Sequence, residues 1–177
     1  KVRGQEYSVM DLSRAATVLL SSALDRIGDP FALHGFCSDG RHDVHYYRFK
    51  DFDQPYNDLV KSRLAAMQGS YSTRMGAALR HARVMLDKQP FERKILLLVT
   101  DGEPSDVDVK DDNYLIEDTA QAVRAITGGG IIPFCLTVDK KAERYVAQIF
   151  GDRYLLLDNP QDLVTQLSHV FVRLLSR

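Results

Sequence analysis

The stretch LLLVTDGEPSD, residues 96–106, is the feature that most constrains the fold of this chain. Its unbroken apolar run is typical of a central strand that other elements cover on both faces. The run ends in Thr100, Asp101 and Gly102, and an acidic loop that contains Pro104 follows. A buried strand that ends on a carboxylate beside a glycine indicates that Asp101 either closes a turn or binds a ligand.

Helix-like and strand-like segments alternate along the chain. Apolar residues at intervals of three or four predict helices over residues 9–27, 59–67, 75–86 and 116–126. Short apolar or alternating runs predict strands over residues 31–38, 42–50, 94–100, 131–138 and 154–157. A short helix is expected near residues 141–149, and a last helix is expected to begin at Asn159-Pro160, with Asn as its cap.

The order of these elements predicts the fold class. Strands that are separated by helices indicate an α/β fold with a mostly parallel sheet between layers of helices. The turn DGR, residues 39–41, joins two of the predicted strands tightly, so these two must be antiparallel. The expected architecture is therefore a central, mostly parallel sheet with one antiparallel edge strand and helices on both faces.

Composition excludes several classes of function. A chain of 177 residues suits one domain, and its formal net charge of -1 gives no electrostatic reason to expect nucleic acid or an anionic membrane as a partner. No apolar run approaches the roughly 20 residues of a membrane span. Cys37 and Cys135 lie in strand-like segments, which favours two buried thiols in a reducing compartment. No export signal is visible, although the chain begins with Lys1 rather than Met.

Thr73 and Asp101 are the candidate ligands of a metal ion. Asp101 follows a predicted strand, and ligands gather at the carboxyl ends of strands in open α/β sheets. Each residue also has a purely structural interpretation, because Thr73 could cap the next helix and Asp101 could cap a turn or helix. Together, a hydroxyl and a carboxylate are hard oxygen ligands, which suit Mg²⁺ with several retained waters.

The segments YSTRMGAAL, residues 71–79, and LLLVTDG, residues 96–102, resemble the von Willebrand factor type A (VWA) domain and its metal-ion-dependent adhesion site. In that family, one strand end carries Asp-x-Ser-x-Ser, a loop supplies a Thr, and a later strand ends in an Asp. The resemblance maps the last two positions onto Thr73 and Asp101. It implies a Rossmann-like fold and a Mg²⁺ ion, or another divalent cation, that binds an acidic group from another protein.

Three long stretches narrow this resemblance to the NorD/CbbO-type proteins. They are residues 28–53, residues 71–82, and residues 96–109 with the helix at 116–124 that follows. These proteins are bacterial and cytoplasmic and work beside a MoxR-class AAA+ ATPase. The CbbO branch reactivates inhibited Rubisco with its ATPase, and the NorD branch helps to activate nitric oxide reductase. The resemblance therefore implies a non-enzymatic adaptor between the ATPase and a client enzyme that presents an acidic residue.

Residues that flank the two expected ligands are predicted to form a rim that selects the partner. The arginine suits pairing with a carboxylate, and the acidic side chains belong to the loop after Asp101. A solvated loop without a binding role is the alternative. The predicted rim consists of Tyr71, Ser72, Arg74, Glu103 and Asp106.

The first motif of the family is absent from its expected place. The only Asp-x-Ser is Asp11-Leu12-Ser13, which lies inside the first predicted helix. We therefore expect residues 1–177 to be a VWA domain whose first strand and Asp-x-Ser-x-Ser motif lie upstream of Lys1. The missing strand would leave a slot between the strands at 31–38 and 94–100, which an upstream fragment or a strand from another molecule would fill. The ion site would then be incomplete within these residues.

Two other functions compete with the adaptor. A metal-dependent phosphohydrolase could use Asp101 as nucleophile or ligand, with Asp106 as a second carboxylate, although these two form a weak constellation. An extracellular adhesion domain would share the fold, but the unpaired cysteines and the absence of an export signal count against it. The chain has no Walker-type glycine loop, so nucleotide binding of that kind is not expected.

Overall fold

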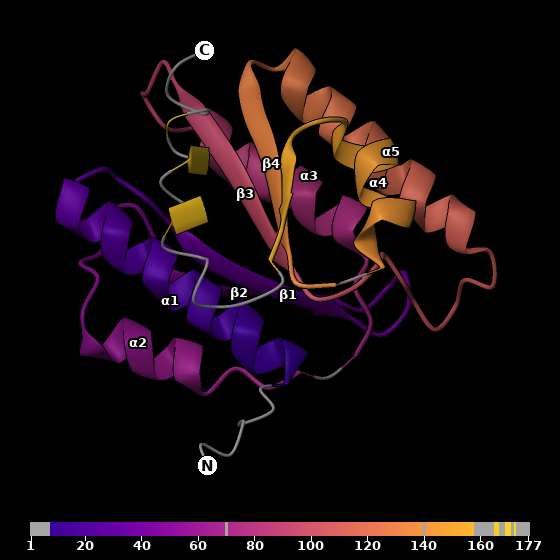
Figure 1. The fold of residues 1–177 in the computed structure, drawn as a ribbon, viewed down its shortest axis with the longest axis horizontal. Coiled ribbons are helices and arrows are strands. Elements are labelled where there is room, and N and C mark those ends of the chain that lie inside the picture. Colours follow the sequence, from indigo (N-terminus) through magenta and orange to yellow (C-terminus); the bar gives the residue numbers. More distant parts are fainter. Residues whose placement is uncertain are drawn as a thin grey trace.

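A computed structural model of the chain describes residues 8–69, 71–139 and 141–157, together with residues 165, 166, 169, 170 and 172. Helices and strands are interspersed along the chain, and the α/β fold class predicted from the sequence is confirmed (Figure 1). The start of the predicted last helix, Asn159-Pro160, lies outside the described residues. Within the described ranges, no helix combines the length and the apolar character that crossing a membrane requires.

The first helix, α1 (Val9–Ile27), has the bounds that its apolar spacing predicts. It begins at a capping box, in which the Ser8 hydroxyl accepts a hydrogen bond from the Asp11 N–H at 3.1 Å and the Asp11 carboxylate accepts one from the Ser8 N–H at 3.2 Å. It ends at Gly28, whose φ of 82° is the left-handed conformation that glycine favours at a helix C-terminus. Asp11 is thus part of a helix start rather than of a strand-end loop.

The strands form two separate sheets. The antiparallel pair β1 (Leu33–Ser38) and β2 (Val44–Lys50) makes one sheet. The parallel strands β3 (Lys94–Thr100), β4 (Ile131–Thr137) and β5 (Tyr154–Leu156) make the other. The hairpin turn of the first sheet is longer than the predicted DGR, because the Asp39 N–H bonds the Asp43 carbonyl and the Asp43 N–H bonds the Gly40 carbonyl.

The two sheets are separated at the slot that the sequence predicts between the strands at 31–38 and 94–100. No ladder of hydrogen bonds joins β1 to β3 within the described part of the chain. The break falls between the two strands that were expected to flank a missing one. Local sequence propensity determines where each strand forms. The two sheets could become one only if another strand, with unpaired backbone N–H and C=O groups, lay between β1 and β3.

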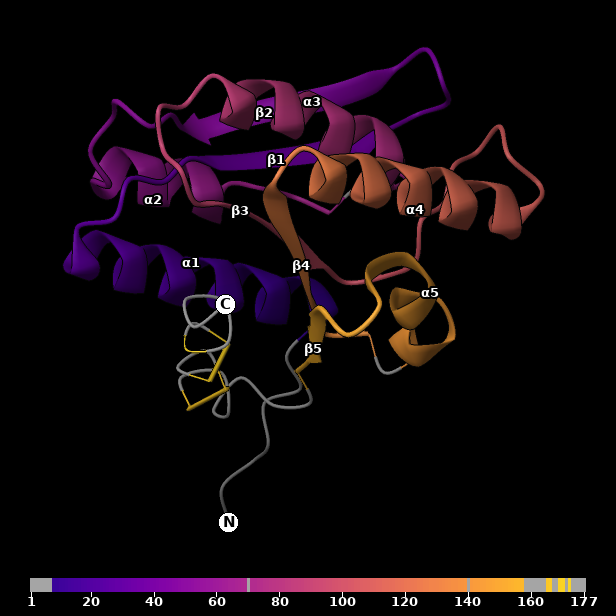
Figure 2. The same ribbon diagram turned by 90° about the horizontal axis from the view of Figure 1, so that it is seen from above.

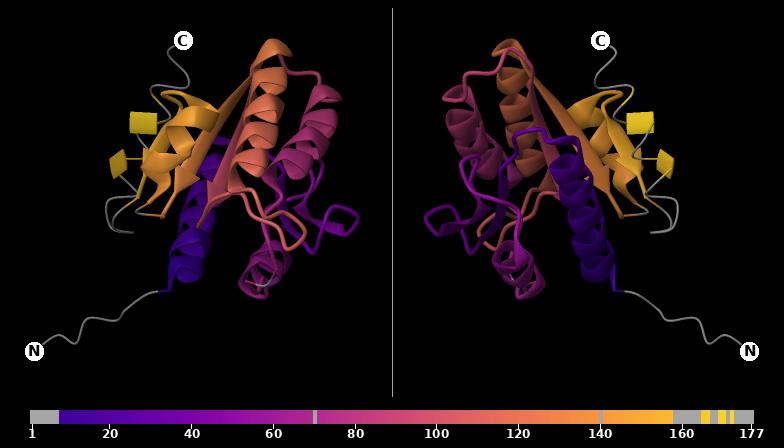
Figure 3. Two further views of the ribbon diagram at one scale, coloured as in Figure 1. Left: turned by 90° about the vertical axis from the view of Figure 1, so that its right-hand side faces the viewer. Right: turned by 90° about the vertical axis from the view of Figure 1, so that its left-hand side faces the viewer.

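Helices cover both faces of the parallel sheet. Figure 2 shows α1 on one side of β3 and β4, and α3 (Met75–Asp87) and α4 (Asp112–Gly128) on the other. α3 and α4 lie side by side (Figure 3). The short α2 (Asp58–Ala65) packs near α1, and a 3-10 helix, η1 (Ala142–Arg144), leads into α5 (Val146–Phe150).

Two main apolar clusters hold these layers together. The larger cluster joins α3, α4 and α5 to the sheet through fully buried side chains such as Ile126, Val146 and Cys135. The smaller one packs Ala16 and Leu20 of α1 against the opposite face. Cys135 is buried as expected, whereas Cys37 is only half-buried. The parallel sheet is therefore a rigid base for the loops that follow its strands.

Candidate functional site

The loops after β3 and β4 leave the parallel sheet at the same edge. The two strands pair in register up to Thr100 and Thr137, so Asp101 and Asp139 both emerge there. The Asp139 carboxylate accepts hydrogen bonds from the Lys141 N–H at 2.8 Å and from the Tyr145 hydroxyl at 3.2 Å. Asp139 therefore closes the turn into η1, while Asp101 is exposed at the sheet edge.

Thr73 lies against the loop that Asp101 begins. Its backbone forms an isolated bridge with Ser105, with N–H to carbonyl distances of 2.9 and 3.2 Å in the two directions. Its hydroxyl donates a hydrogen bond to the Glu103 carbonyl at 3.1 Å and lies 3.3 Å from the Ser105 hydroxyl. The carbonyl that Thr73 contacts is two residues from Asp101, so the two segments that carry the predicted ligands meet at one place.

Neither Thr73 nor Asp101 has the capping role that was its structural alternative. The N-cap of α3 is Arg74, and no side chain makes a capping hydrogen bond there. The turn after β3 is closed by the Thr100 hydroxyl, which lies 3.0 Å from the Gly102 carbonyl and 3.3 Å from the Gly102 N–H. The next helix, α4, is capped by Asp111. Among the described residues, the Asp101 carboxylate has no hydrogen-bond partner.

The donor set at this edge fits Mg²⁺ in kind but supplies only part of a coordination shell. Thr73 and Asp101 offer a hydroxyl and a carboxylate, and the Ser105 hydroxyl is a neighbour of Thr73. In the described part of the chain, no group of three or more His, Cys, Asp or Glu side chains could hold a metal ion. Because Mg²⁺ binds through one or two carboxylates and several waters, the remaining ligands would have to come from water or from another segment.

Two residues of the predicted rim, Arg74 and Asp106, form a buried ion pair rather than an exposed surface. Arg74 Nε lies 2.7 Å from Asp106 Oδ2, and the side chains are 11% and 0% exposed. The other Asp106 oxygen accepts hydrogen bonds from the Gly40 and Val107 N–H groups, each at 2.8 Å. Arg74 also pairs with Asp108. The pair therefore ties the hairpin turn, the start of α3 and the loop after β3 together.

Hydrogen bonding sets the protonation of Asp106. Burial on its own would raise the pKa of this carboxyl. The Gly40 N–H, the Arg74 guanidinium, the Ser38 hydroxyl and the Val107 N–H outweigh burial and hold the pKa of Asp106 below its ordinary value. Asp106 is thus an ionised anchor of the loop at neutral pH.

The other rim residues lie nearer the surface. Tyr71 is 67% exposed and has a φ of 76°, a left-handed conformation that costs a residue with a Cβ about 1–2 kcal/mol. Its ring stacks on His45, with the centroids 6.2 Å apart. Glu103 is exposed, and Ser72 is half-buried and bridged to Ser38 at the end of β1. The contribution of these side chains to partner binding stays a prediction.

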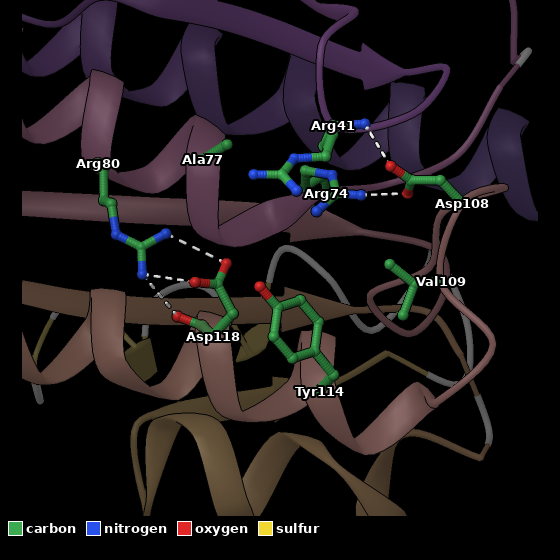
Figure 4. Close-up of a pocket in the computed structure, with 8 residues that line it drawn as sticks. All are labelled: Arg41, Arg74, Ala77, Arg80, Asp108, Val109, Tyr114 and Asp118. Atoms are coloured by element: carbon green, nitrogen blue, oxygen red, sulfur yellow. Dashed lines mark hydrogen bonds and ion pairs between the residues drawn. The ribbon is translucent and has the colours of Figure 1, made fainter.

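The sequence did not point to a second group of charged residues, which lies where α3 and α4 meet. Arg41, Arg80, Tyr114 and Asp118 line a pocket beside Arg74 (Figure 4). The spacing of its residues in the sequence gives only a weak signal for this pocket. Residues 77 and 80 share one face of a helix, and residues 114 and 118 share one face of the next helix. Nothing in the sequence says that these faces oppose each other, since that depends on how the helices pack.

Comparisons with known proteins match most of the chain. Residues 8–160 match the family model of the von Willebrand factor type A domain. A protein named NorD from Stutzerimonas stutzeri is 43% identical over 157 residues, which are 88% of this chain and 26% of that protein. An uncharacterized protein from Pseudomonas aeruginosa is 42% identical over 167 residues, which are 94% of this chain and 27% of that protein. The chain thus spans about a quarter of the length of these relatives.

Two more distant matches are a sequence relative and a solved structure. NorD from Brucella melitensis biotype 1 is 35% identical over 164 residues, which cover 92% of this chain and 26% of that protein. Among solved structures, the PilB minor pilin from Streptococcus sanguinis superposes with a TM-score of 0.71 at 16% identity. The superposition covers 95% of this chain and 54% of the pilin. At that identity, the pilin supports the fold alone.

Proposed function

Because this chain belongs to the von Willebrand factor type A domain family, and its relatives include proteins named NorD, we propose that it is the Mg²⁺-dependent protein-binding module of a NorD-type accessory protein. In this role the domain is not an enzyme. It binds an acidic residue of another protein and leaves mechanical work to a separate ATPase.

The contact between the Thr73 segment and the loop after Asp101 is the observation that carries this proposal. The Thr73 hydroxyl lies 3.1 Å from the Glu103 carbonyl, and neither Thr73 nor Asp101 is used as a helix or turn cap. A hydroxyl that joins the two loops and a carboxylate without a hydrogen-bond partner among the described residues suit a shared ion better than two independent caps.

Thr73 and Asp101 are the residues that would hold the ion. When bound, Mg²⁺ supplies a Lewis-acidic position that a carboxylate from a partner can fill. The role of Thr73 is to offer its hydroxyl from a loop that the Ser105 bridge immobilises. The role of Asp101 is to offer its carboxylate from the rigid end of β3. Hydroxyl and water ligands carry no charge, so a shell with few carboxylates leaves the ion electrophilic, which favours an acidic partner.

We propose that the partners are a MoxR-type AAA+ ATPase and a client enzyme in the cytoplasm. The names of the relatives favour nitric oxide reductase as the client over Rubisco, the client of the CbbO branch. The chain spans about a quarter of the length of these relatives. Binding of the client is therefore proposed for a whole protein that contains such a domain, and not for this domain alone. The domain would supply recognition, with Tyr71 and Glu103 placed beside the ion.

The break between the two sheets supports one further part of the proposal. A strand from outside residues 1–177 would pair with β1 and β3 and join the sheets into one. The same strand would bring the missing Asp-x-Ser-x-Ser ligands to the sheet edge where Asp101 emerges. An upstream segment of the same protein and a strand from another molecule both satisfy this requirement.

A phosphohydrolase is less well supported. The second carboxylate that it would need is Asp106, and this side chain is buried against Arg74. A buried carboxylate that is already paired is poorly placed to act on a substrate at Asp101.

The decisive experiment is capture of the client and the ATPase by the full-length protein, with Mg²⁺ or with EDTA. Thr73→Ala and Asp101→Ala should each reduce capture to the level seen with EDTA, and calorimetric titration should show loss of Mg²⁺ binding. Glu92→Ala is the matched control, because Glu92 is an exposed carboxylate near the opposite end of β3. Capture by both site variants at the wild-type level would contradict the proposal.

A further inference from the structure

A pocket of about 370 Å³ opens beside the Arg74–Asp106 pair. It lies between the hairpin turn, the first two turns of α3, the loop after β3 and the start of α4 (Figure 4). The charged and polar side chains that line it are Arg41, Arg74, Arg80, Asp108, Tyr114 and Asp118.

The carboxylates of this pocket are already satisfied. Asp108 accepts a hydrogen bond from the Arg41 backbone N–H at 2.8 Å with one oxygen and pairs with Arg74 through the other. Asp118 accepts from Arg80 with both oxygens, Nη2 to Oδ1 at 2.7 Å and Nη1 to Oδ2 at 3.1 Å. A cationic ligand would have to displace an arginine from one of these pairs.

The donors of the pocket are in excess. The Arg41 guanidinium has no ion-pair or hydrogen-bond partner among the described residues, and it lies beside the Arg74 side chain (Figure 4). Arg74 uses Nε and Nη2 for its two carboxylates, so Nη1 is left to donate. The Tyr114 hydroxyl is also unpaired within the described part of the chain. The pocket therefore offers N–H and O–H groups without matching acceptors.

We infer that this pocket binds an oxyanion, the phosphate or carboxylate group of a small molecule. The planar guanidinium of Arg41 presents a fork of donors that matches two oxygens of such a group. Arg74 and Arg80 are held in place by Asp108 and Asp118, so little side-chain entropy is lost when the ligand arrives. The volume lies at the lower end of the range of about 300–1,000 Å³ for small-molecule sites, which suits a compact ligand.

This site is distinct from the proposed metal face. The Thr73 hydroxyl is directed at the Glu103 carbonyl, whereas the side chain of Arg74, the next residue, is directed at Asp106 and Asp108. Oxyanion binding requires only arginine and tyrosine donors, so it should persist after divalent cations have been removed. The inference can therefore stand or fall independently of the proposed function.

The test is titration of the purified chain with inorganic phosphate, pyrophosphate and citrate, by calorimetry at low salt after divalent cations have been removed on a chelating resin. At least one probe should bind saturably, and the NMR signals of residues 41, 74, 80 and 114 should shift together. Arg41→Gln should weaken that binding by about tenfold or more, the loss of one charge-assisted contact. Arg144→Gln should bind as the wild type does, because Arg144 is an exposed arginine on η1.

Three outcomes would overturn the inference. They are no saturable binding by any probe up to about 10 mM, the weak end of specific recognition; equal affinity in Arg41→Gln; and binding of a phosphopeptide without binding of any small anion. Since the Arg41 side chain is exposed and has no described partner, Arg41→Gln should fold, and an unchanged melting temperature would verify this.

Discussion

The guanidinium of Arg74 and the carboxylate of Asp106 form a buried ion pair, with Nε 2.7 Å from Oδ2, that joins the start of α3 to the loop after β3. The carboxylate also receives the Gly40 N–H of the hairpin turn at 2.8 Å. The pair thus links the small antiparallel sheet to the parallel one at the edge where Thr73 and Asp101 lie. The two buried side chains therefore hold the neighbouring loops in place.

Removal of Arg74 should destabilise the fold strongly. Arg74→Ala leaves Asp106 buried without its charged partner, a change that typically costs about 3–5 kcal/mol. Arg124→Ala is the control, because the Arg124–Glu117 pair is exposed, and its loss should change stability by less than about 1 kcal/mol. Urea unfolding followed by circular dichroism gives both values. Equal losses of stability in the two variants would mean that the buried pair contributes no more to folding than the exposed pair does.

The Asp106 carboxylate should make stability depend on pH in the acid range. Its pKa is lower in the folded protein than its ordinary value of 3.8, so the unfolded chain takes up the proton first as the pH falls. Its contribution is fully present above pH 3.8 and is lost as the pH falls through the folded pKa. The stability difference between the wild type and Asp106→Asn should therefore shrink from about pH 6 to about pH 3. A difference that stays constant would contradict this linkage.

Gly76 should not tolerate a side chain. A Cβ at this position would lie 2.1 Å from Asp118 Oδ2 and 3.1 Å from Arg80 Nη1, so it would break the Asp118–Arg80 pair between α4 and α3. We expect Gly76→Ala to lose about 1–3 kcal/mol in urea unfolding. Gly128→Ala, in the last turn of α4 with nothing within 4 Å of its Cβ, should be neutral or stabilising.

A double variant tests the mechanism at Gly76. If the clash with Asp118 is the cause, Gly76→Ala combined with Asp118→Ala should lose less stability than the sum of the two single variants. Additive losses would place the cause elsewhere.

Tyr71 should matter for binding and not for folding. Its φ of 76° suits glycine, so Tyr71→Gly relieves backbone strain while removing an exposed ring. The melting temperature should stay the same or rise, while capture of the client by the full-length protein should fall. A large drop in melting temperature would show instead that the stacking of Tyr71 on His45 holds the loop.

The two cysteines should react at different rates. Burial raises the pKa of the Cys135 thiol to about 12, so little reactive thiolate forms at neutral pH. Cys37 is only half-buried. Thiol titration of the native protein should label Cys37 first, and Cys135 only after denaturant is added. Equally fast labelling would mean that the parallel sheet opens readily.

The helices and strands could be predicted from the sequence because their signals are local. The bounds of α1 follow from the Ser8 capping box, its apolar spacing and Gly28, and the unbroken apolar run of β3 follows from burial on both faces. Asp101 and Thr73 could be singled out for the same reason, since one follows a strand and the other precedes a helix.

Long-range arrangements could not be predicted in this way. Arg74 and Asp106 are 32 residues apart, and only the folded chain shows that they are buried against each other. The break between β1 and β3 also has no local signal, because each strand has the composition of a sheet strand whether or not a neighbour pairs with it. The pocket that contains Arg41, Arg80 and Tyr114 depends in addition on how α3 packs against α4.

Two isolated backbone bridges, Ser72 to Ser38 and Thr73 to Ser105, connect the end of β1 in the antiparallel sheet to the loop that follows β3 in the parallel sheet. A change in the spacing of the two sheets would therefore act on these two bridges as well as on the Arg74–Asp106 pair. Thr73 lies at the centre of this connection, so a change in the spacing of the two sheets would shift its hydroxyl relative to the Glu103 carbonyl, 3.1 Å away.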